Sequence, residues 1–310
     1  MGGNSRRAYG GAGFAIDGVP LTVTVRSAAA LTIKDLRNRP MTPDGIRRLR
    51  TALTNACNHL GVSNSVSIEI TGLAGANCGF GTGTAIRLSC LDGALSMAGA
   101  QEELSRLIEL SGRGRTSGVG IQTYFHGGLS LDCGVAAAKG VDLVPSSESE
   151  FLRPVVQPLA RLQMPSWPLG IFMVDSEVIQ GSDEVAFFKE NRRIPKSEID
   201  ELCCELFLNL PGAILDGDII EFSKTLNRIQ DIGFKALEWR RLGDEAKKAS
   251  NWLYDQGALA VALSSMGPAI VAVFKEEADA QQAVSSFRKG FNASHLAKPR
   301  PEGRRLRAWR

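Results

Sequence analysis

The sequence predicts an α+β protein, because strands and helices are both expected in each half of the chain. Alternating apolar residues predict strands at 21–25 and 66–72. Apolar residues at helical spacing predict helices at 42–61, 195–210, 216–239 and 275–291. The chain has 310 residues, of which 44% are hydrophobic and 22% charged, so it can bury a sizeable core. No internal repeat is visible.

Composition argues against several classes of protein. The net charge of +3 is too small to indicate nucleic-acid binding. The longest apolar stretch, 257–274, is broken by Ser-Ser, Gly and Pro, which predicts two buried strands joined by a turn and not a membrane span. The polar start MGGNSRRAYG does not resemble a signal peptide, and the six cysteines form no CxxC pair. Free thiols in a reducing cytoplasm are therefore expected.

Changes in composition along the chain predict two domains and a tail. A segment rich in proline and serine, 136–168, is the expected boundary, which gives domains at 1–145 and 146–298. Residues 299–310 are rich in arginine and are expected to be a solvated, disordered tail.

The first candidate site is a glycine loop that opens a helix. Gly79, Gly81 and Gly83 lead directly into an amphipathic segment that runs to residue 99. The first amides of a helix lack internal partners and the helix dipole is positive there, so this end can hold an anion. Thr82 and Thr84 can cap the helix or donate hydroxyl groups to a phosphate. The pattern is neither a Walker loop nor a complete GxGxxG.

A second glycine loop, SGRGRTSGVG at 111–120, carries Arg113 and Arg115. A helix is expected before it at 101–110, and a hairpin after it at 119–134 with His126 near the turn. Glycines permit close approach of a ligand, and arginines suit a phosphate or carboxylate.

These elements resemble the GHMP superfamily of small-molecule kinases. Three glycine-bearing segments occur in order, at 78–89, 112–120 and 264–273. Within the superfamily, RGRTSGVGIQTYFHGGLSLDCG (113–134) resembles the β-ribofuranosylaminobenzene 5′-phosphate synthase family, as do 7–17, 229–238 and 264–268. That family includes the C-glycoside synthases of antibiotics such as formycin and pyrazofurin. The implied fold is an N-terminal mixed α/β sandwich domain followed by a ferredoxin-like α+β domain.

The resemblance implies a cytoplasmic transferase and not a kinase. Members join the anomeric carbon of phosphoribosyl pyrophosphate (PRPP) to a ring carbon of an aromatic or heteroaromatic carboxylic acid, with loss of carbon dioxide and pyrophosphate. ATP is not consumed, and Mg²⁺ is the expected cofactor because it clamps the leaving pyrophosphate. Neither nucleic acid nor a membrane is an expected partner, and a homodimer is common among such folds.

The resemblance also implies roles for individual residues. The residues expected to bind PRPP are Gly79, Gly81, Thr82, Gly83, Thr84, Arg113, Gly114, Arg115, Thr116, Ser117, Gly118, Ser264, Ser265, Met266 and Gly267. The expected catalytic residues are His126, Asp132, Lys235 and Asp17, and the acceptor is expected at Tyr9, Gly10, Gly11 and Arg240. No metal ligand is assigned.

Several alternatives stay open at this stage. An ATP-dependent kinase of the same superfamily and a non-catalytic phosphosugar-binding relative both fit the glycine loops. His126 can also be an ordinary turn residue, and Asp132 can simply end a strand. Lys235 can be a solvated side chain. Members usually carry another strand before the RAYGG stretch, which here follows only MGGNSR, and a missing strand would put activity in doubt. The acceptor can be a benzoate or, with a slight preference from segments 7–17 and 264–273, a pyrazole dicarboxylate.

Overall fold

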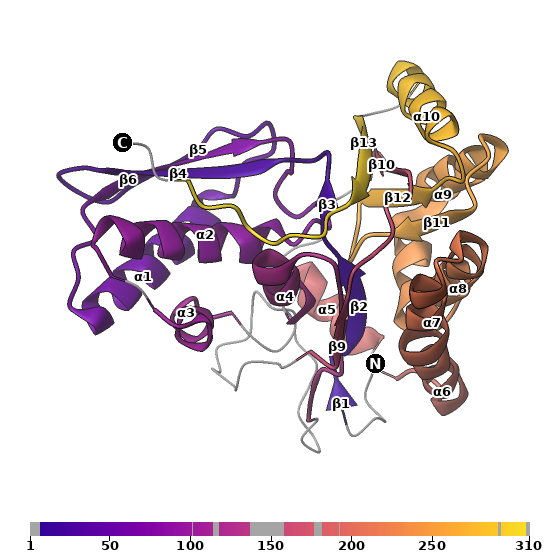
Figure 1. Ribbon diagram of the computed structural model, residues 1–310, viewed down its shortest axis with the longest axis horizontal. Coiled ribbons are helices and arrows are strands. Elements are labelled where there is room, and N and C mark those ends of the chain that lie inside the picture. Colours follow the sequence, from indigo (N-terminus) through magenta and orange to yellow (C-terminus); the bar gives the residue numbers. More distant parts are fainter. Residues whose placement is uncertain are drawn as a thin grey trace.

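The computed structural model describes residues 7–100, 102–113, 118–136, 158–176, 182–191, 193–290 and 293–307. Two halves lie side by side, and both contain sheet and helix (Figure 1). The predicted α+β class is therefore confirmed. The boundary expected near residue 145 falls outside the described residues and stays a prediction.

A three-stranded sheet and two long helices form the far end of the N-terminal half. Strand β6 (Val66–Gly72) lies between antiparallel β4 (Leu21–Ser27) and parallel β5 (Thr32–Asp35). Helices α1 (Pro43–Leu60) and α2 (Thr82–Met97) bury their apolar side chains beneath this sheet. The predicted strands and both helices are confirmed, and α1 ends at a left-handed Gly61 as expected.

The middle of the molecule joins the start of the chain to the segment after the second glycine loop. Strand β2 (Gly11–Phe14) pairs with β7 (Leu129–Asp132), which also pairs with β9 (Ala160–Leu162). A second small sheet joins β1 (Arg7–Ala8) to β8 (Val135–Ala136). The two segments that carry most of the family resemblance, 7–17 and 113–134, are thus neighbours in space.

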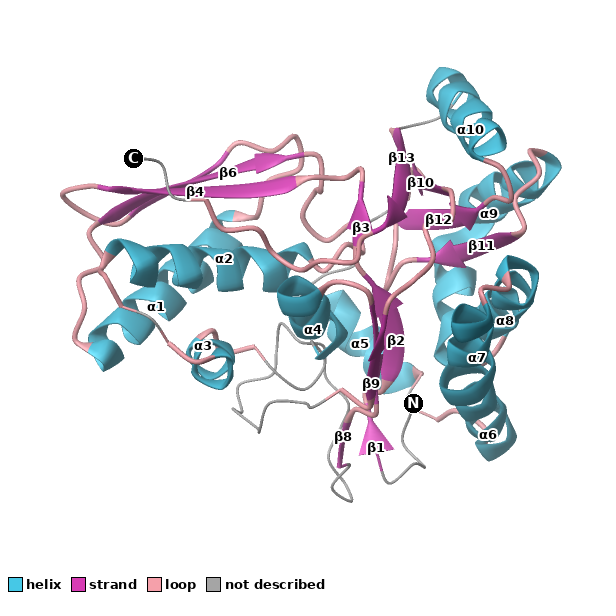
Figure 2. Cartoon of the chain, in the orientation of Figure 1, coloured by secondary structure: helices cyan, strands magenta, loops and turns pink. Residues whose placement is uncertain are grey.

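The predicted hairpin at 119–134 is wrong in its first half. Residues Gly118–His126 form a helix, α4, which follows α3 (Leu104–Leu110), as Figure 2 shows. Ile121 and Phe125 lie four residues apart and are both buried in the core that α2 lines. That spacing places both side chains on one face of a helix. Their packing against the core outweighs the alternating pattern that predicted a strand.

The C-terminal half is a five-stranded sheet covered by helices. Its strand order is β11 (Ala260–Leu263), β12 (Ala269–Val273), β10 (Leu169–Met173), β13 (Ser294–Pro299) and β3 (Ile16–Asp17). The last of these comes from the start of the chain, so the sheet of the C-terminal half includes a strand from the N-terminal half. The strands predicted within 257–274 and at 170–177 are confirmed as β11, β12 and β10.

The helices of this half differ in detail from the sequence prediction. They are α5 (Ser182–Glu190), α6 (Lys196–Cys204), a π-helical turn (Glu205–Asn209), α7 (Leu210–Asp216), α8 (Ile219–Asp231), α9 (Gly233–Asp255) and α10 (Glu277–Gly290). The single helix predicted at 216–239 is two helices, because Ile232 is extended and Gly233 has a φ of 59°. The chain turns there and α9 leaves in a new direction.

The basic tail differs from the solvated segment that composition predicts. In Figure 1 the yellow C-terminal segment runs beside α2 toward the C-terminus. Arg304 Nε donates to Asp92 Oδ2 of α2 at 2.5 Å, and its guanidinium lies 4.9 Å from the centroid of the Phe125 ring of α4. The backbone of Arg300 also donates to the Ala15 carbonyl. Residues 300–304 are therefore held against this part of the N-terminal half, because Arg304 contacts both an acid of α2 and aromatic faces of α4.

Replacing Arg304 with alanine should lower the free energy of unfolding by about 2 kcal/mol, because the substitution leaves Asp92 without its partner in a largely buried place. Urea denaturation followed by circular dichroism measures this. Arg305→Ala is the matched control, since Arg305 pairs with Glu302 in solvent and its replacement should leave the free energy of unfolding nearly unchanged. Equal losses from the two variants would show that Arg304 does not anchor the tail.

Candidate functional site

The first glycine loop lies directly against the loop between β11 and β12. Ser264 Oγ donates to the Gly79 carbonyl at 2.9 Å. Gly79 has a φ of 91°, and a Cβ added there would lie 2.1 Å from the Ser264 carbonyl oxygen. Two segments predicted to bind phosphate, 78–84 and 264–267, are thereby brought into contact across 185 residues of sequence.

The same loop leaves open space at the start of α2. Gly81 is the N-cap residue, in a left-handed conformation and with no side-chain hydrogen bond to the helix. A Cβ added at Gly81 or Gly83 would meet no atom of the described structure within 4 Å. The first amides of α2 therefore border volume that the described residues leave unfilled, as an anion site at a helix start requires.

Arg113 links the second glycine loop to this helix. Its Nε and Nη2 donate to Thr84 Oγ1 at 3.1 and 2.8 Å. Burial, together with the charge of Arg87, lowers the pKa of Arg113 to about 10, so the guanidinium stays charged at neutral pH. Gly120 of α4 also lies against the Thr84 side chain, so the starts of α2 and α4 are adjacent. Thr84, expected to cap α2 or to meet a phosphate, here accepts hydrogen bonds from Arg113.

Asp132 lies at the start of α4 and is buried. A Cβ added at Gly118 would lie 1.8 Å from Asp132 Oδ2, so only glycine allows this approach. The other oxygen, Oδ1, accepts from the Gly134 amide at 2.7 Å. Burial raises the pKa of Asp132 to about 6, although the Gly134 hydrogen bond and the Arg7 charge oppose this shift. A carboxylate with such a pKa, beside a helix start, is a candidate for proton transfer or charge stabilisation near neutral pH.

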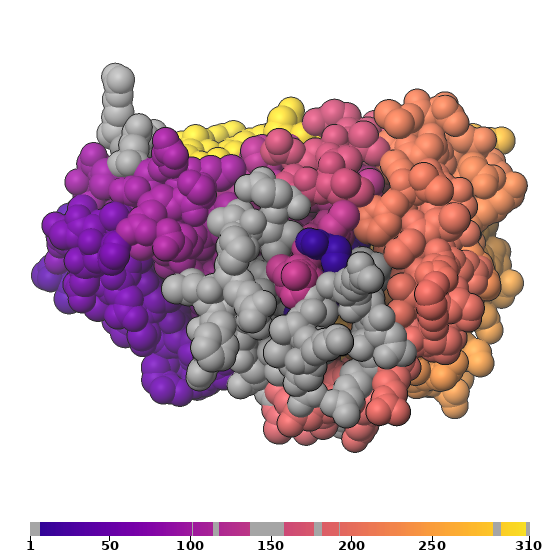
Figure 3. Space-filling model, turned by 90° about the horizontal axis from the view of Figure 1, so that it is seen from below, coloured from indigo at the N-terminus to yellow at the C-terminus, as the bar shows by residue number. Residues whose placement is uncertain are grey.

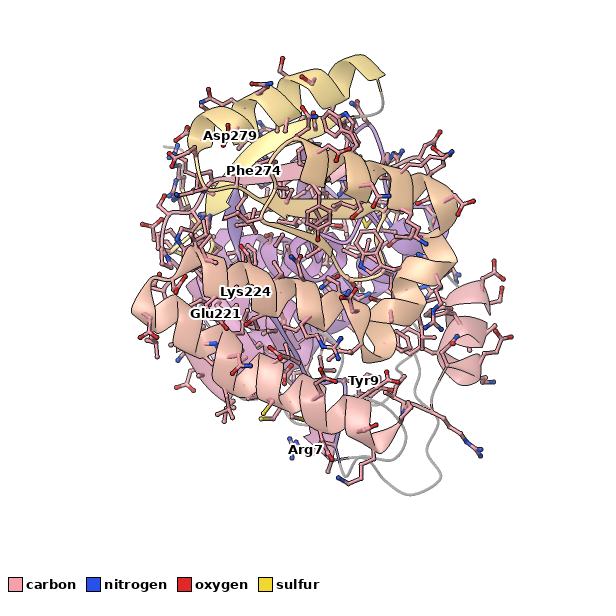
Figure 4. The ribbon with its side chains drawn as sticks, turned by 90° about the vertical axis from the view of Figure 1, so that its right-hand side faces the viewer. Arg7, Tyr9, Glu221, Lys224, Phe274 and Asp279 are labelled. Atoms are coloured by element: carbon pink, nitrogen blue, oxygen red, sulfur yellow. The ribbon has the colours of Figure 1, made fainter. Side chains whose placement is uncertain are left out.

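Three of the four residues expected to hold the acceptor are close to Asp132. Strand pairing sets Gly11 opposite Asp132, and Tyr9 and Gly10 precede it directly. Tyr9 has a φ of 65°, which is uncommon for a residue with a side chain and often marks a functional position. Figure 4 labels Arg7 and Tyr9 near one another at the lower end of the molecule, whereas the labelled Glu221 and Lys224 belong to α8. In Figure 3, seen from below, indigo atoms from the start of the described chain reach the surface in the middle of this face.

Lys235 and Arg241 support the loop between β11 and β12. Lys235 Nζ donates to the Ser265 carbonyl at 2.7 Å and pairs with Glu238 Oε2 at 2.6 Å, and Arg241 Nη2 donates to the Met266 carbonyl at 2.6 Å. Burial raises the pKa of Glu238, and the Lys235 charge opposes this. Lys235, predicted to be catalytic, is thus occupied in positioning Leu263 and Ser265. Arg240 is exposed on the same helix.

His126 and Asp17 are not brought together with the glycine loops. His126 ends α4, whereas Asp132 adjoins its start, about 12 Å away at 1.5 Å per residue. Gly127 and Gly128 have positive φ, and a Cβ at Gly127 would lie 2.4 Å from the Glu302 backbone. The two glycines therefore let the chain turn and let the tail pass closely. Asp17 is half exposed on β3 and lies 3.5 Å from Arg300, its partner in a surface ion pair.

Sequence reasoning missed one residue near this site and placed others where the structure describes nothing. Gly114, Arg115, Thr116 and Ser117 lie outside the described residues, so their predicted roles stay predictions. Arg87 of α2 was not singled out, although it is the only lysine or arginine between Arg50 and Arg106. A lone cation in a helix that opens at a glycine loop is the signal that could have found it.

The part of the chain that the structure describes contains no group of three His, Cys, Asp or Glu side chains able to hold a metal ion. None of its helices combines the length and apolar character needed to span a bilayer. A protein-only magnesium cage is therefore not formed by these residues.

Comparison with known proteins identifies first the fold and then proteins of similar sequence. The GHMP kinases C-terminal family matches residues 210–293. Homoserine kinase from Cytophaga hutchinsonii shares the fold with a TM-score of 0.64 at 15% identity, covering 94% of this chain and 90% of that one. L. major mevalonate kinase gives 0.64 at 16% identity, covering 96% and 91%. The fold is that of the GHMP kinase superfamily.

Sequence similarity narrows this class. The β-ribofuranosylphenol 5′-phosphate synthase of Archaeoglobus fulgidus is 27% identical over 273 residues, covering 88% of this chain and 82% of the relative. The protein of the same name from Methanothermobacter thermautotrophicus is 29% identical over 233 residues, covering 74% and 70%. These similarities support the resemblance of the chain to the β-ribofuranosylaminobenzene 5′-phosphate synthase family.

Proposed function

We propose that this protein is a PRPP-dependent, decarboxylating C-ribosyltransferase. The observation that carries the proposal is the convergence of the two glycine loops, through Arg113 on Thr84, beside the carboxylate of Asp132. The curated relatives support it, since their name describes a product with ribose phosphate on a phenol ring.

The chemistry needs little acid–base work from the protein. The bond between the ribose anomeric carbon and pyrophosphate breaks, and its electron pair leaves with pyrophosphate. The acceptor ring then supplies an electron pair to the anomeric carbon, and the bond to the carboxylate breaks to restore the aromatic ring. The amides at the start of α2 would stabilise the negative charge on pyrophosphate, and Asp132 the positive charge on the ribose.

The relatives support a hydroxybenzoate-type acceptor for this chain. A pyrazole dicarboxylate is the second candidate, because segments 7–17 and 264–273 resemble the antibiotic branch of the family. Mg²⁺ would enter bound to the pyrophosphate of PRPP, since Mg²⁺ is commonly held by substrate phosphates with few protein ligands. This would not require the multi-carboxylate cage that the described residues lack.

The test is a mass-spectrometric assay of the purified chain with PRPP and Mg²⁺. Separate reactions contain 4-hydroxybenzoate, 4-aminobenzoate or 4-aminopyrazole-3,5-dicarboxylate. We expect a product equal to the acceptor plus ribose phosphate minus carbon dioxide, with release of pyrophosphate. Reactions with ATP and homoserine or mevalonate serve as controls for kinase activity. ADP formation there, with no C-riboside in any reaction, would overturn the proposal in favour of a kinase.

A further inference from the structure

Three oxygen atoms lie within 3.2 Å of the ammonium group of Lys235 on α9. Its Nζ donates to the Leu263 carbonyl at 3.2 Å and to the Ser265 carbonyl at 2.7 Å. The third oxygen is Glu238 Oε2, at 2.6 Å. An ammonium carries three donors and no acceptor, so two carbonyls and one carboxylate match its capacity. This arrangement suits a support for the loop between β11 and β12 better than a ligand for an anion.

Glu238 is buried although it carries a carboxyl group. Its side chain is 6% exposed, whereas that of Lys235 is 25% exposed. Residues 235, 238 and 241 follow one another at spacings of three, so they lie on one side of α9. A buried carboxylate costs free energy unless a cation neutralises it. Lys235 therefore cannot turn toward solvent without leaving Glu238 buried and without this partner, which keeps the ammonium group in place.

The loop between β11 and β12 has an uncommon conformation that needs such support. Ser265 has a φ of 50°, which costs free energy for a residue with a side chain and persists only where its surroundings impose it. Arg241 Nη2 donates to the Met266 carbonyl at 2.6 Å, so a second side chain of α9 holds the next residue. Ser264 Oγ in turn donates to the Gly79 carbonyl at 2.9 Å. Side chains of α9 thus act on the first glycine loop through the hydrogen bond of Ser264.

We propose that Glu238 is a positioning residue for the donor site: it holds Lys235 in place, and so fixes the loop between β11 and β12 and, through Ser264, the first glycine loop. This deepens the proposed function and rests on it for the identity of the donor. Backbone amides bind a phosphate well only when they are held in a fixed arrangement. Loosening the loop should therefore weaken binding of PRPP and affect the acceptor little.

Hydrogen–deuterium exchange of the full chain without ligand, measured by mass spectrometry, tests the positioning role. Glu238→Gln keeps the shape of the side chain and removes its charge. Backbone amides of 263–267 and 78–84 should exchange about 10-fold faster in this variant, whereas those of β6 should be unchanged. Glu245→Gln is the matched control, since Glu245 pairs with Lys248 at 2.7 Å on the same helix but in solvent. It should leave exchange in both loops unaltered.

A double-mutant cycle separates this role from a general effect on stability. Lys235→Met removes the ammonium group through which Glu238 acts, so adding Glu238→Gln to it should not raise exchange in the two loops further. In assays of turnover, Glu238→Gln should raise the KM for PRPP about 10-fold and the KM for the acceptor less than about twofold.

Unchanged exchange in both loops, a rise of the same size throughout the C-terminal half, additive effects in the cycle, or an equal rise in both KM values would overturn the inference. If Glu238→Gln does not fold, as circular dichroism would show, Lys235→Met takes its place, and unchanged exchange at 263–267 in that variant counts against the role. Exchange is measured without PRPP or acceptor. The positioning role can therefore be established even if C-ribosyl transfer is not observed, and transfer can be observed even if Glu238 proves unimportant.

Discussion

Replacing Asp132 with asparagine is expected to lower kcat about 100-fold or more with every acceptor that the enzyme uses. The substitution keeps the size of the side chain and an oxygen for the Gly134 amide, but removes the negative charge beside the start of α4. Burial raises the pKa of Asp132 to about 6, so in the unaltered enzyme the carboxylate becomes ionised as the pH rises through 6. Activity should rise with pH over that range, and the variant should lose this dependence.

Ser130→Ala is a suitable control for Asp132→Asn. Ser130 lies two residues earlier on the same face of β7, and its buried hydroxyl has no hydrogen-bond partner among the described residues. The alanine variant should keep kcat within about twofold, since nothing charged or paired is removed. If Asp132→Asn kept more than a tenth of kcat and an unchanged pH profile, Asp132 would have a structural role only.

Local patterns predicted most of the fold, and their failure at 118–126 is instructive. Strands β4 and β6 and helices α1 and α2 were predictable because the spacing of apolar residues in each segment fits only one type of secondary structure. Segment 118–126 contains glycine at 118 and 120 and ends at Gly127-Gly128, which weakens any helical signal. Packing of Ile121 and Phe125 against the α2 core decides the outcome, and that core is built by residues distant in sequence.

The candidate site was predictable only in its local parts. Both glycine loops are recognisable because their composition is unusual over ten residues. The contact of the first glycine loop with Ser264, and the support that Lys235 gives to the β11–β12 loop, depend on residues far apart in the sequence. His126 illustrates the opposite case. Its glycine neighbours resemble a functional turn, but the structure uses them to accommodate the backbone of the C-terminal tail.

Gly79 and Gly83 should respond differently to alanine, although both belong to the first glycine loop. Gly79→Ala places a Cβ in a left-handed residue and against the Ser264 carbonyl, so it should lower the free energy of unfolding by about 2–4 kcal/mol. Chemical denaturation measures this loss. Unchanged stability would mean that the contact between the first glycine loop and the β11–β12 loop is not formed as described.

Gly83→Ala should leave the fold intact and damage function. Gly83 lies in the first turn of α2, where alanine is the better helix former and can add up to about 1 kcal/mol of stability. No atom of the described residues lies within 4 Å of a Cβ built there, and under the proposed function PRPP fills that space. The KM for PRPP should therefore rise about 10- to 100-fold, because a methyl group displaces the phosphate from the helix amides.

Gly212→Ala in α7 is the control, because a Cβ at Gly212 also meets no atom within 4 Å of the described structure and α7 is a separate helix. This variant should change the free energy of unfolding by a similar amount and leave the KM for PRPP unaltered. A Gly83→Ala enzyme with normal KM would show that the open volume at α2 is not where the donor binds.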